Sequence, residues 1–178
     1  SEMEQQHHQL EKQRSAELSV TDIRRTLISR SEVAIVETIG EGTYGTVHKA
    51  VVRGQHVVVK QLKRLEDSSF QSFVDEVQLL CSVMHPNTCL FMGVTEGPSP
   101  MIVMEYLVKG DLKKLLQREG ASLSSLVRMG MLCDAAAGLA WLHHSGVVHR
   151  DVKLENLLVD ANYRVKVADF GLSQFLKR

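Results

Sequence analysis

Short apolar runs rich in β-branched residues recur between residues 33 and 106. Runs of this length and composition are typical of strands that are at least half buried. They cover residues 33–39, 46–52, 56–61, 90–95 and 101–106. Turn-forming residues separate neighbouring runs, with Gly54 between the second and third and Pro98 and Pro100 between the fourth and fifth. The pattern predicts five strands.

Helical spacing interrupts the strands once and dominates after residue 110. Apolar residues at 70, 73, 74, 77 and 80 repeat with helical period, and Ser68 and Gln71 match a capping box. Further helices are predicted over residues 111–118 and 124–144, the second ending near Gly146. We expect its buried face to consist of Leu132, Ala135, Ala136, Leu139 and Leu142. Two short strands, 157–159 and 165–167, are predicted to follow.

The change from strands to helices divides the chain into parts. Residues 1–30 are rich in Gln, Glu, Arg and Lys, which predicts a solvated helix or a linker. Residues 31–105 are predicted to form a strand-rich lobe, residues 106–110 a connection, and residues 111–178 a helical lobe. The predicted fold class is therefore α+β.

Composition narrows the possible functions. The 178 residues are 44% hydrophobic and 24% charged, which is typical of a globular protein with a core. The 21 basic and 21 acidic residues cancel, so we expect no nucleic-acid partner. No run approaches the ~18 to 20 apolar residues of a membrane-spanning helix, so we expect no transmembrane segment. Three cysteines without a CxxC pair predict an intracellular, cytoplasmic location, or the cytoplasmic part of a larger protein.

Gly40, Gly42 and Gly45 form a GxGxxG motif. In a dinucleotide-binding fold a helix follows the glycines and an acidic residue stands ~20 positions further on. Here a predicted strand follows, and Lys60 stands 20 residues after Gly40. A Walker A loop is excluded because no GK[ST] follows. The motif is either a hairpin whose amides can approach phosphates, since no Cβ blocks them, or an ordinary turn.

Lys60 follows three valines, and strand alternation turns it inward if Val58 faces the core. An inward ammonium needs a partner. On the next predicted helix, a projection of about 100° per residue places Glu76 at the edge of the apolar stripe and Asp75 opposite that stripe. Glu76 is therefore the acid best placed to pair with Lys60. The alternative is that both side chains lie separately on the surface.

Residues 149–156 read HRDVKLEN, and residues 169–171 read DFG. With the glycine motif, the strand lysine and the helix glutamate, these complete five motifs in the order of the eukaryotic protein kinase family, which residues 33–178 resemble. HPN at 85–87 and FMG at 91–93 further resemble the tyrosine-kinase-like group, especially Raf-like and mixed-lineage kinases. The resemblance implies a two-lobed kinase fold. Its small lobe would hold a five-stranded antiparallel sheet and one helix, and its large lobe would be mainly helical.

The resemblance also implies that ATP and Mg²⁺ are the cofactors. Gly40, Gly42 and Gly45 would cover the phosphates, and Lys60, held by Glu76, would contact the α and β phosphates. Asn156 and Asp169 would hold Mg²⁺ through oxygen atoms. Asp151 would orient the substrate hydroxyl and accept its proton, while Lys153 would meet the γ-phosphate. His149 would be a packed structural residue.

The adenine pocket is implied in the same way. Val47, Val58 and Leu158 match apolar positions that sandwich the adenine ring. Met104 matches the gatekeeper position behind it. The backbone of Glu105 and Leu107 matches the hinge that reads the adenine edge.

The implied function is transfer of the γ-phosphate of ATP to serine or threonine hydroxyls of a protein substrate. Only nine residues follow Asp169. By resemblance we therefore expect an incomplete large lobe, without the rest of the activation segment, and negligible protein phosphorylation by residues 1–178 alone. One alternative is a nucleotide-binding pseudokinase, which the intact Lys60, Asp151 and Asp169 disfavour. Another is a scaffold fragment whose first 30 residues recruit a partner.

Overall fold

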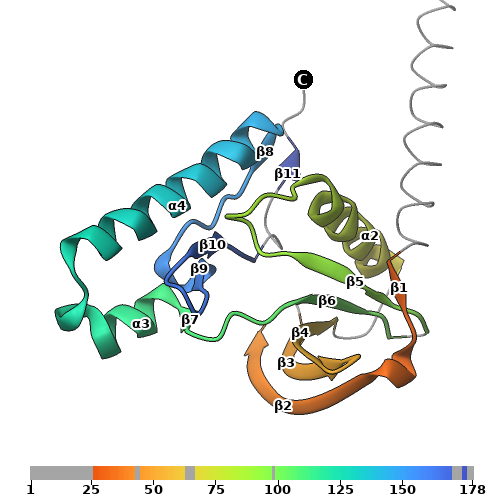
Figure 1. Ribbon diagram of the computed structural model, residues 1–178. Coiled ribbons are helices and arrows are strands. Elements are labelled where there is room, and N and C mark those ends of the chain that lie inside the picture. Colours follow the sequence, from red (N-terminus) through yellow and green to blue (C-terminus); the bar gives the residue numbers. More distant parts are fainter. Residues whose placement is uncertain (1–25, 43–44, 63–66, 98, 170–173, 176–178) are drawn as a thin grey trace, which may run out of the picture.

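The computed structural model describes residues 26–42, 45–62, 67–97, 99–169 and 174–175. A sheet-rich lobe and a helical lobe lie side by side and are joined by the chain after residue 105 (Figure 1). This arrangement agrees with the predicted α+β, two-lobed fold. Of the predicted N-terminal helix or linker, residues 1–25 lie outside the described residues.

All five predicted strands form. They are β2 (Val33–Gly42), β3 (Gly45–Val52), β4 (Gln55–Leu62), β5 (Phe91–Thr95) and β6 (Met101–Glu105). Each pairs antiparallel with its neighbours in the order β5-β6-β4-β3-β2. Between β3 and β4, Arg53 and Gly54 both have positive φ, 50° and 80°, as a two-residue hairpin turn requires.

A sixth strand, β1 (Leu27–Ile28), pairs parallel with β5 at the edge of this sheet. The sequence reading missed β1 because two residues are too few to show a period, and they lie in a segment interpreted as polar. Ile28 is nevertheless 93% buried, with a relative exposure of 7%. The small-lobe sheet is therefore mixed, with one parallel pair added to five antiparallel strands.

The two faces of the sheet bury different cores. One face packs Ala50, Val57, Val59, Met101 and Val103 against Ile28 and Val33. The opposite face contacts α2 (Asp67–Ser82), whose buried residues Val77 and Leu80 join Phe91, Val94 and Ile102 in the main core. Strand alternation produces this separation, because successive side chains point to opposite faces.

The helical lobe contains the two predicted helices. Asp111 caps α3 (Leu112–Glu119) by accepting a 2.9 Å bond from the backbone amide of Lys114. Ser124 caps α4 (Ser125–His144) by accepting from the amide of Val127. Short strands complete the lobe. β7 (Gly110–Asp111), β9 (Leu157–Val159) and β10 (Val165–Val167) form one sheet, and β8 (Val147–Val148) pairs with β11 (Gln174–Phe175).

Three single turns of 3₁₀ helix occur in the part of the chain that the structure describes. They are η1 (Arg30–Glu32) before β2, η2 (Gly120–Ser122) after α3 and η3 (Leu154–Asn156) before β9.

The predicted buried face of α4 is partly wrong. Leu132 is 63% exposed and Ala136 is also exposed, whereas Ala135 and Leu142 are buried as predicted. The buried residues of the helix are Met131, Asp134, Ala135, Gly138 and Leu142. The hydrophobic pattern missed this face because it contains a glycine and an aspartate. A Cβ at Gly138 would lie 2.4 Å from the Asn87 carbonyl oxygen, so glycine lets α4 approach that loop closely.

By length and composition alone, α4 is the one helix among the described residues that could cross a membrane, with a mean hydropathy of 1.2 over 18 residues. This is weak support for a membrane span, because core helices pass the same test. The buried side of α4 packs on β8 and β10 of the large lobe. We therefore treat α4 as a helix of this lobe.

Candidate active site

Lys60 and Glu76 meet between the sheet and α2. The ammonium nitrogen of Lys60 lies 2.6 Å from Oε1 of Glu76, and the two side chains are only 11% and 14% exposed. Lys60 lies directly opposite Val47 of β3 and Ile102 of β6. Because directly opposite residues on antiparallel strands share a face, all three side chains lie on the same face of the sheet. The valine run and helix projection predicted this contact, and the structure contains it. Pairing offsets part of the cost of removing both charges from water.

Two of the residues assigned to the adenine pocket, Val47 and Val58, lie beside Lys60 in the sheet. Val58 is paired with Met104 and points to the same face of the sheet as Lys60. Met104 and Leu158 pack against a small cluster formed by Cys89, Leu107 and Ala168. The structure therefore brings together Met104, Leu107 and Leu158, which the family resemblance predicts as gatekeeper, hinge and adenine-pocket residues.

The glycine motif occupies the end of the β2–β3 hairpin. Gly40 is paired with Val47, and Gly42 with Gly45. Residues 43–44, at the tip, lie outside the described residues. A Cβ added at Gly40 would meet the Val47 Cβ at 3.7 Å, an ordinary contact. The packing of the protein itself therefore does not demand glycine at position 40.

Glu105 connects three segments through its side chain. Both carboxylate oxygens accept from the Lys166 ammonium on β10, at 2.6 and 2.8 Å, and Oε1 also accepts a 2.7 Å bond from the amide of Leu90. Its own amide donates to the Leu90 carbonyl. Sequence reasoning assigned only a backbone role to Glu105 and missed Lys166. Their separation of 61 residues left no local signal for the pair.

Asp151, Lys153 and Asn156 converge in the large lobe. Oδ2 of Asp151 accepts from the Lys153 ammonium at 2.6 Å and from the Asn156 side-chain amide at 2.9 Å. The same amide donates to the Asp151 backbone carbonyl. The bond from Lys153 holds the pKa of Asp151 below its ordinary value, and Asn156 acts in the same direction. That bond also raises the pKa of Lys153. Asp151 is therefore a carboxylate at neutral pH.

His149 is a buried structural residue, as its resemblance to the family implied. It is 1% exposed, and its Nε2 lies 2.8 Å from the carbonyl oxygen of Ala168. The amide of Asp151 donates to its Nδ1. Since Nδ1 accepts, Nε2 carries the proton and donates to Ala168. The ring thereby links the segment of Asp151 to the residue before Asp169.

Two non-glycine residues beside this link have left-handed backbone conformations, Arg150 with φ of 67° and Asp169 with φ of 63°. Such conformations are uncommon and are concentrated at functional sites. Ala168, just before Asp169, donates its amide to the Asn156 carbonyl. Asn156 and Asp169 are thus held on adjoining segments. Phe170 and Gly171 lie outside the described residues.

Within the described ranges, no group of three or more His, Cys, Asp or Glu side chains is placed to hold a metal ion. This does not conflict with the predicted Mg²⁺ ligands, because Mg²⁺ in phosphate-binding sites is held by one or two carboxylates together with phosphates and water.

Comparison with known proteins agrees with the fold and with the order of the motifs. The family described as protein tyrosine and serine/threonine kinase matches residues 33–178, and the chain belongs to this family. The predicted family resemblance is therefore confirmed.

Among its relatives, the chain is 43% identical over 155 residues to the dual specificity protein kinase shkA of Dictyostelium discoideum, a match that covers 85% of this chain and 29% of that protein. It is 43% identical over 151 residues to the dual specificity protein kinase shkC of the same organism, covering 82% of this chain and 30% of that protein. It is 44% identical over 150 residues to the serine/threonine-protein kinase CTR1 of Arabidopsis thaliana, covering 80% and 18%. The chain thus spans less than a third of the length of each.

Proposed function

We propose that this chain provides the nucleotide-binding and catalytic-loop part of a protein kinase that transfers the γ-phosphate of ATP to serine or threonine hydroxyls of a protein. The observation that carries the proposal is the formed Lys60–Glu76 pair, 2.6 Å between its charged atoms, in a chain that also assembles Asp151, Lys153 and Asn156. Family membership supports the reaction class.

The residues present fit a nucleotide and a metal ion. Glycine at position 40 is not required by packing, so its missing Cβ is better explained by room for phosphates. The Asn156 side chain uses its nitrogen to bond Asp151, which leaves the amide oxygen as a donor atom for Mg²⁺. Asp169 would supply the carboxylate. Mg²⁺, when bound, neutralises charge on the phosphates.

Asp151 would orient the substrate hydroxyl and accept its proton. The bond from Lys153 holds the pKa of this carboxylate below its ordinary value, so the group is ionised and can accept a hydrogen bond from the hydroxyl. We assign it both roles, since the proton can be taken up as the hydroxyl oxygen becomes acidic during transfer. Lys153 bonds the same oxygen of Asp151 and would contribute positive charge beside the γ-phosphate.

The choice of serine and threonine rests on Lys153, two residues after Asp151, which matches serine/threonine kinases. The names of the relatives include dual specificity kinases. Tyrosine phosphorylation in addition to serine and threonine is therefore compatible with the family. Phosphotyrosine as the dominant product would contradict the assignment.

The test is transfer of radiolabelled γ-phosphate to a generic protein substrate by the native full-length chain. Asp151→Asn keeps the side-chain shape and removes the proton acceptor, so turnover should fall by roughly 10²- to 10⁴-fold while ATP affinity stays nearly unchanged. Glu155→Gln is the matched control, because it removes one carboxylate from the same loop, and this carboxylate accepts from Lys113 on α3 rather than bonding Asp151 or Asn156. Wild-type turnover in Asp151→Asn would refute the role. Nucleotide binding without transfer in the wild type would favour the pseudokinase alternative.

A further inference from the structure

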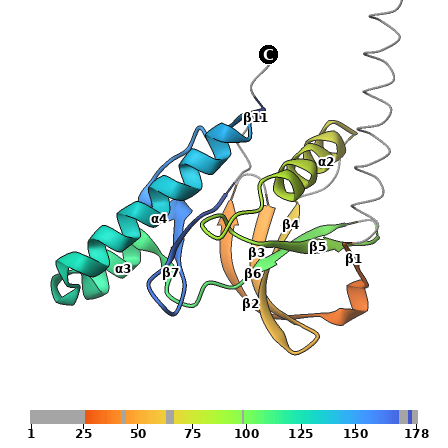
Figure 2. The same cartoon turned by 45° about the horizontal axis from the view of Figure 1, so that its top comes forward.

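The segment of residues 26–32 precedes the family match, which begins at residue 33, yet it is built into the small lobe. Leu27 and Ile28 pair with Val94 and Thr95 of β5, and the Val94 amide donates a 3.0 Å bond to the Thr26 carbonyl. Figures 1 and 2 both show β1 next to β5. In the strand order of the sheet, β1 and β2 occupy the two opposite edges. We call residues 26–32 the clasp.

β5 is shaped to receive the clasp at Gly93. A Cβ at this position would lie 2.3 Å from the Thr26 carbonyl oxygen and 2.8 Å from Cδ1 of Ile28. A Cβ atom does not approach a backbone oxygen that closely, so any other residue at 93 would displace the clasp. The pairing of β5 with β6 is irregular between Phe91 and Gly93, which marks the same point on β5.

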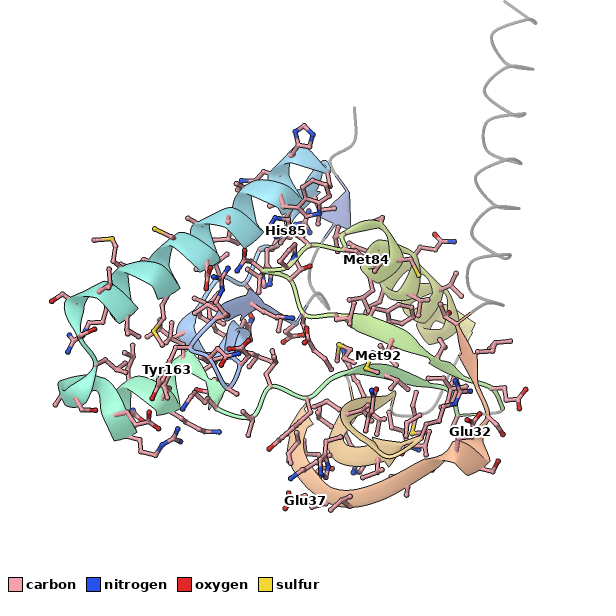
Figure 3. All side chains as sticks on the ribbon, in the orientation of Figure 1. Glu32, Glu37, Met84, His85, Met92 and Tyr163 are labelled. Atoms are coloured by element: carbon pink, nitrogen blue, oxygen red, sulfur yellow. The ribbon has the colours of Figure 1, made fainter. Side chains whose placement is uncertain are left out.

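The other end of the clasp is anchored at the turn between β3 and β4. Glu32, labelled in Figure 3 where the chain enters β2, accepts from the Ser29 amide at 3.2 Å and from the Arg53 guanidinium, with Nη2 at 3.2 Å. Arg53 stands in the turn between β3 and β4. Ile28, between the anchors, is buried in the same core as Val33 and Met101. The clasp thus joins the β5 edge to the β3–β4 hairpin.

β5 in turn supports the elements that carry the site. Val94 is 3% exposed and packs in the main core with Val77 and Leu80 of α2, the helix that presents Glu76. Phe91, at the other end of β5, is paired with the gatekeeper Met104. A shift of β5 would therefore be felt at α2 and behind the adenine pocket.

We propose that the clasp is a positioning element of the kinase: docked on β5 at Gly93, it holds β5 and α2 so that Glu76 stays on Lys60. The effect of the clasp on nucleotide affinity rests on the proposed function, whereas its effect on the position of α2 does not. Residues outside the matched family region would in this way set the state of the site, and a partner that displaces the clasp would lower nucleotide affinity.

The test compares variants of residues 1–178 by hydrogen exchange and by the Kd for Mg-ADP. Gly93→Ala places a Cβ against Thr26, and Ile28→Ser removes the buried side chain of the clasp without altering β5. In both we expect exchange of the Val94 amide to accelerate roughly tenfold or more, faster exchange in the last turns of α2, and Mg-ADP affinity weaker by about three- to thirtyfold.

Two controls separate positioning from general destabilisation. Gly97→Ala also replaces a glycine of positive φ, 108°, but nothing lies within 4 Å of the added Cβ, so exchange at Val94 should not change. Leu142→Ala removes a fully buried side chain of α4 in the other lobe, so it should lower the melting temperature while Mg-ADP affinity is kept.

Three results would overturn the proposal. The first is unchanged exchange at Val94 in Gly93→Ala, and the second is rapid exchange at Val94 with α2 unaffected. The third is an equal loss of affinity in Leu142→Ala. If Gly93→Ala does not fold, Ile28→Ser decides by the same criteria. If the wild type binds no Mg-ADP, the proposed function fails, and exchange in α2 still decides whether the clasp positions that helix.

Discussion

Removing Glu76 should leave an unpaired ammonium in the core of the site. In Glu76→Ala, Lys60 loses its 2.6 Å partner while only 9% of the residue is exposed to water. Breaking a buried pair at one partner costs about 3 to 5 kcal/mol, and the residual exposure of both side chains favours the lower end. For a chain of this length, a loss of about 3 kcal/mol lowers the melting temperature by about 6 to 12 °C. Thermal and urea unfolding of residues 1–178 would measure both quantities.

The double variant Lys60→Met with Glu76→Leu separates stability from binding. Replacing both members of a buried ion pair by apolar residues of similar volume is often neutral or stabilising. We therefore expect the double variant to unfold near the wild-type temperature and yet to lose nucleotide binding, because no ammonium remains for the phosphates. A cost below about 0.5 kcal/mol for Glu76→Ala, as for an exposed pair, would refute the reasoning.

Three further predictions follow from burial and charge. Burial raises the pKa of Cys89 to about 12, so iodoacetamide at pH 8 should label exposed Cys133 and spare Cys89 until the protein unfolds. The pKa of Asp151 is lower in the folded protein than its unfolded value of about 3.9. The stability that its charge contributes is therefore present above that unfolded value and is lost as the pH falls through the folded pKa. The unfolding free energies of wild type and Asp151→Asn should differ by a constant amount from pH 5 to 8 and converge in acid. Three large apolar side chains of α4 are exposed: Leu126 by 83%, Met129 by 59% and Leu132 by 63%. Burying each of them fully would contribute about 1.5 to 3 kcal/mol. Residues 1–178 should therefore self-associate in sedimentation experiments, and Leu132→Lys should reduce the self-association.

The sequence was most informative where local periodicity and local chemistry agree. The valine run before Lys60 indicates that this side chain points inward, and the apolar stripe around Glu76 places Glu76 at the edge of the buried helix face. Together the two patterns predicted a contact between residues that are 16 positions apart. The helices predicted over residues 111–118 and 124–144 agree within one residue with the starts of α3 and α4, where the structure shows Asp111 and Ser124 as the caps. The motif order predicted the fold, because five motifs with fixed spacing rarely occur together by chance.

What the sequence did not predict depends on contacts between distant segments. β1 has two residues and is stabilised by an edge of β5 that lies more than 60 positions away. The buried face of α4 includes Gly138 and Asp134, which no hydrophobic pattern would place inside; Asp134 accepts there from the Val165 amide and Arg164. The Lys166–Glu105 pair likewise joins two lobes. In each case a tertiary partner outweighs the local preference.

Binding of Mg-ATP at the site around Lys60 can be measured by isothermal titration calorimetry of residues 1–178 with a non-hydrolysable ATP analogue. We expect the wild type to bind the analogue, and to bind it more tightly when Mg²⁺ is present. Lys60→Met should weaken binding strongly, Asp169→Asn should remove the Mg²⁺ dependence, and Glu155→Gln should change neither. An affinity that is the same in all four proteins and indifferent to Mg²⁺ would show that this site does not bind Mg-ATP.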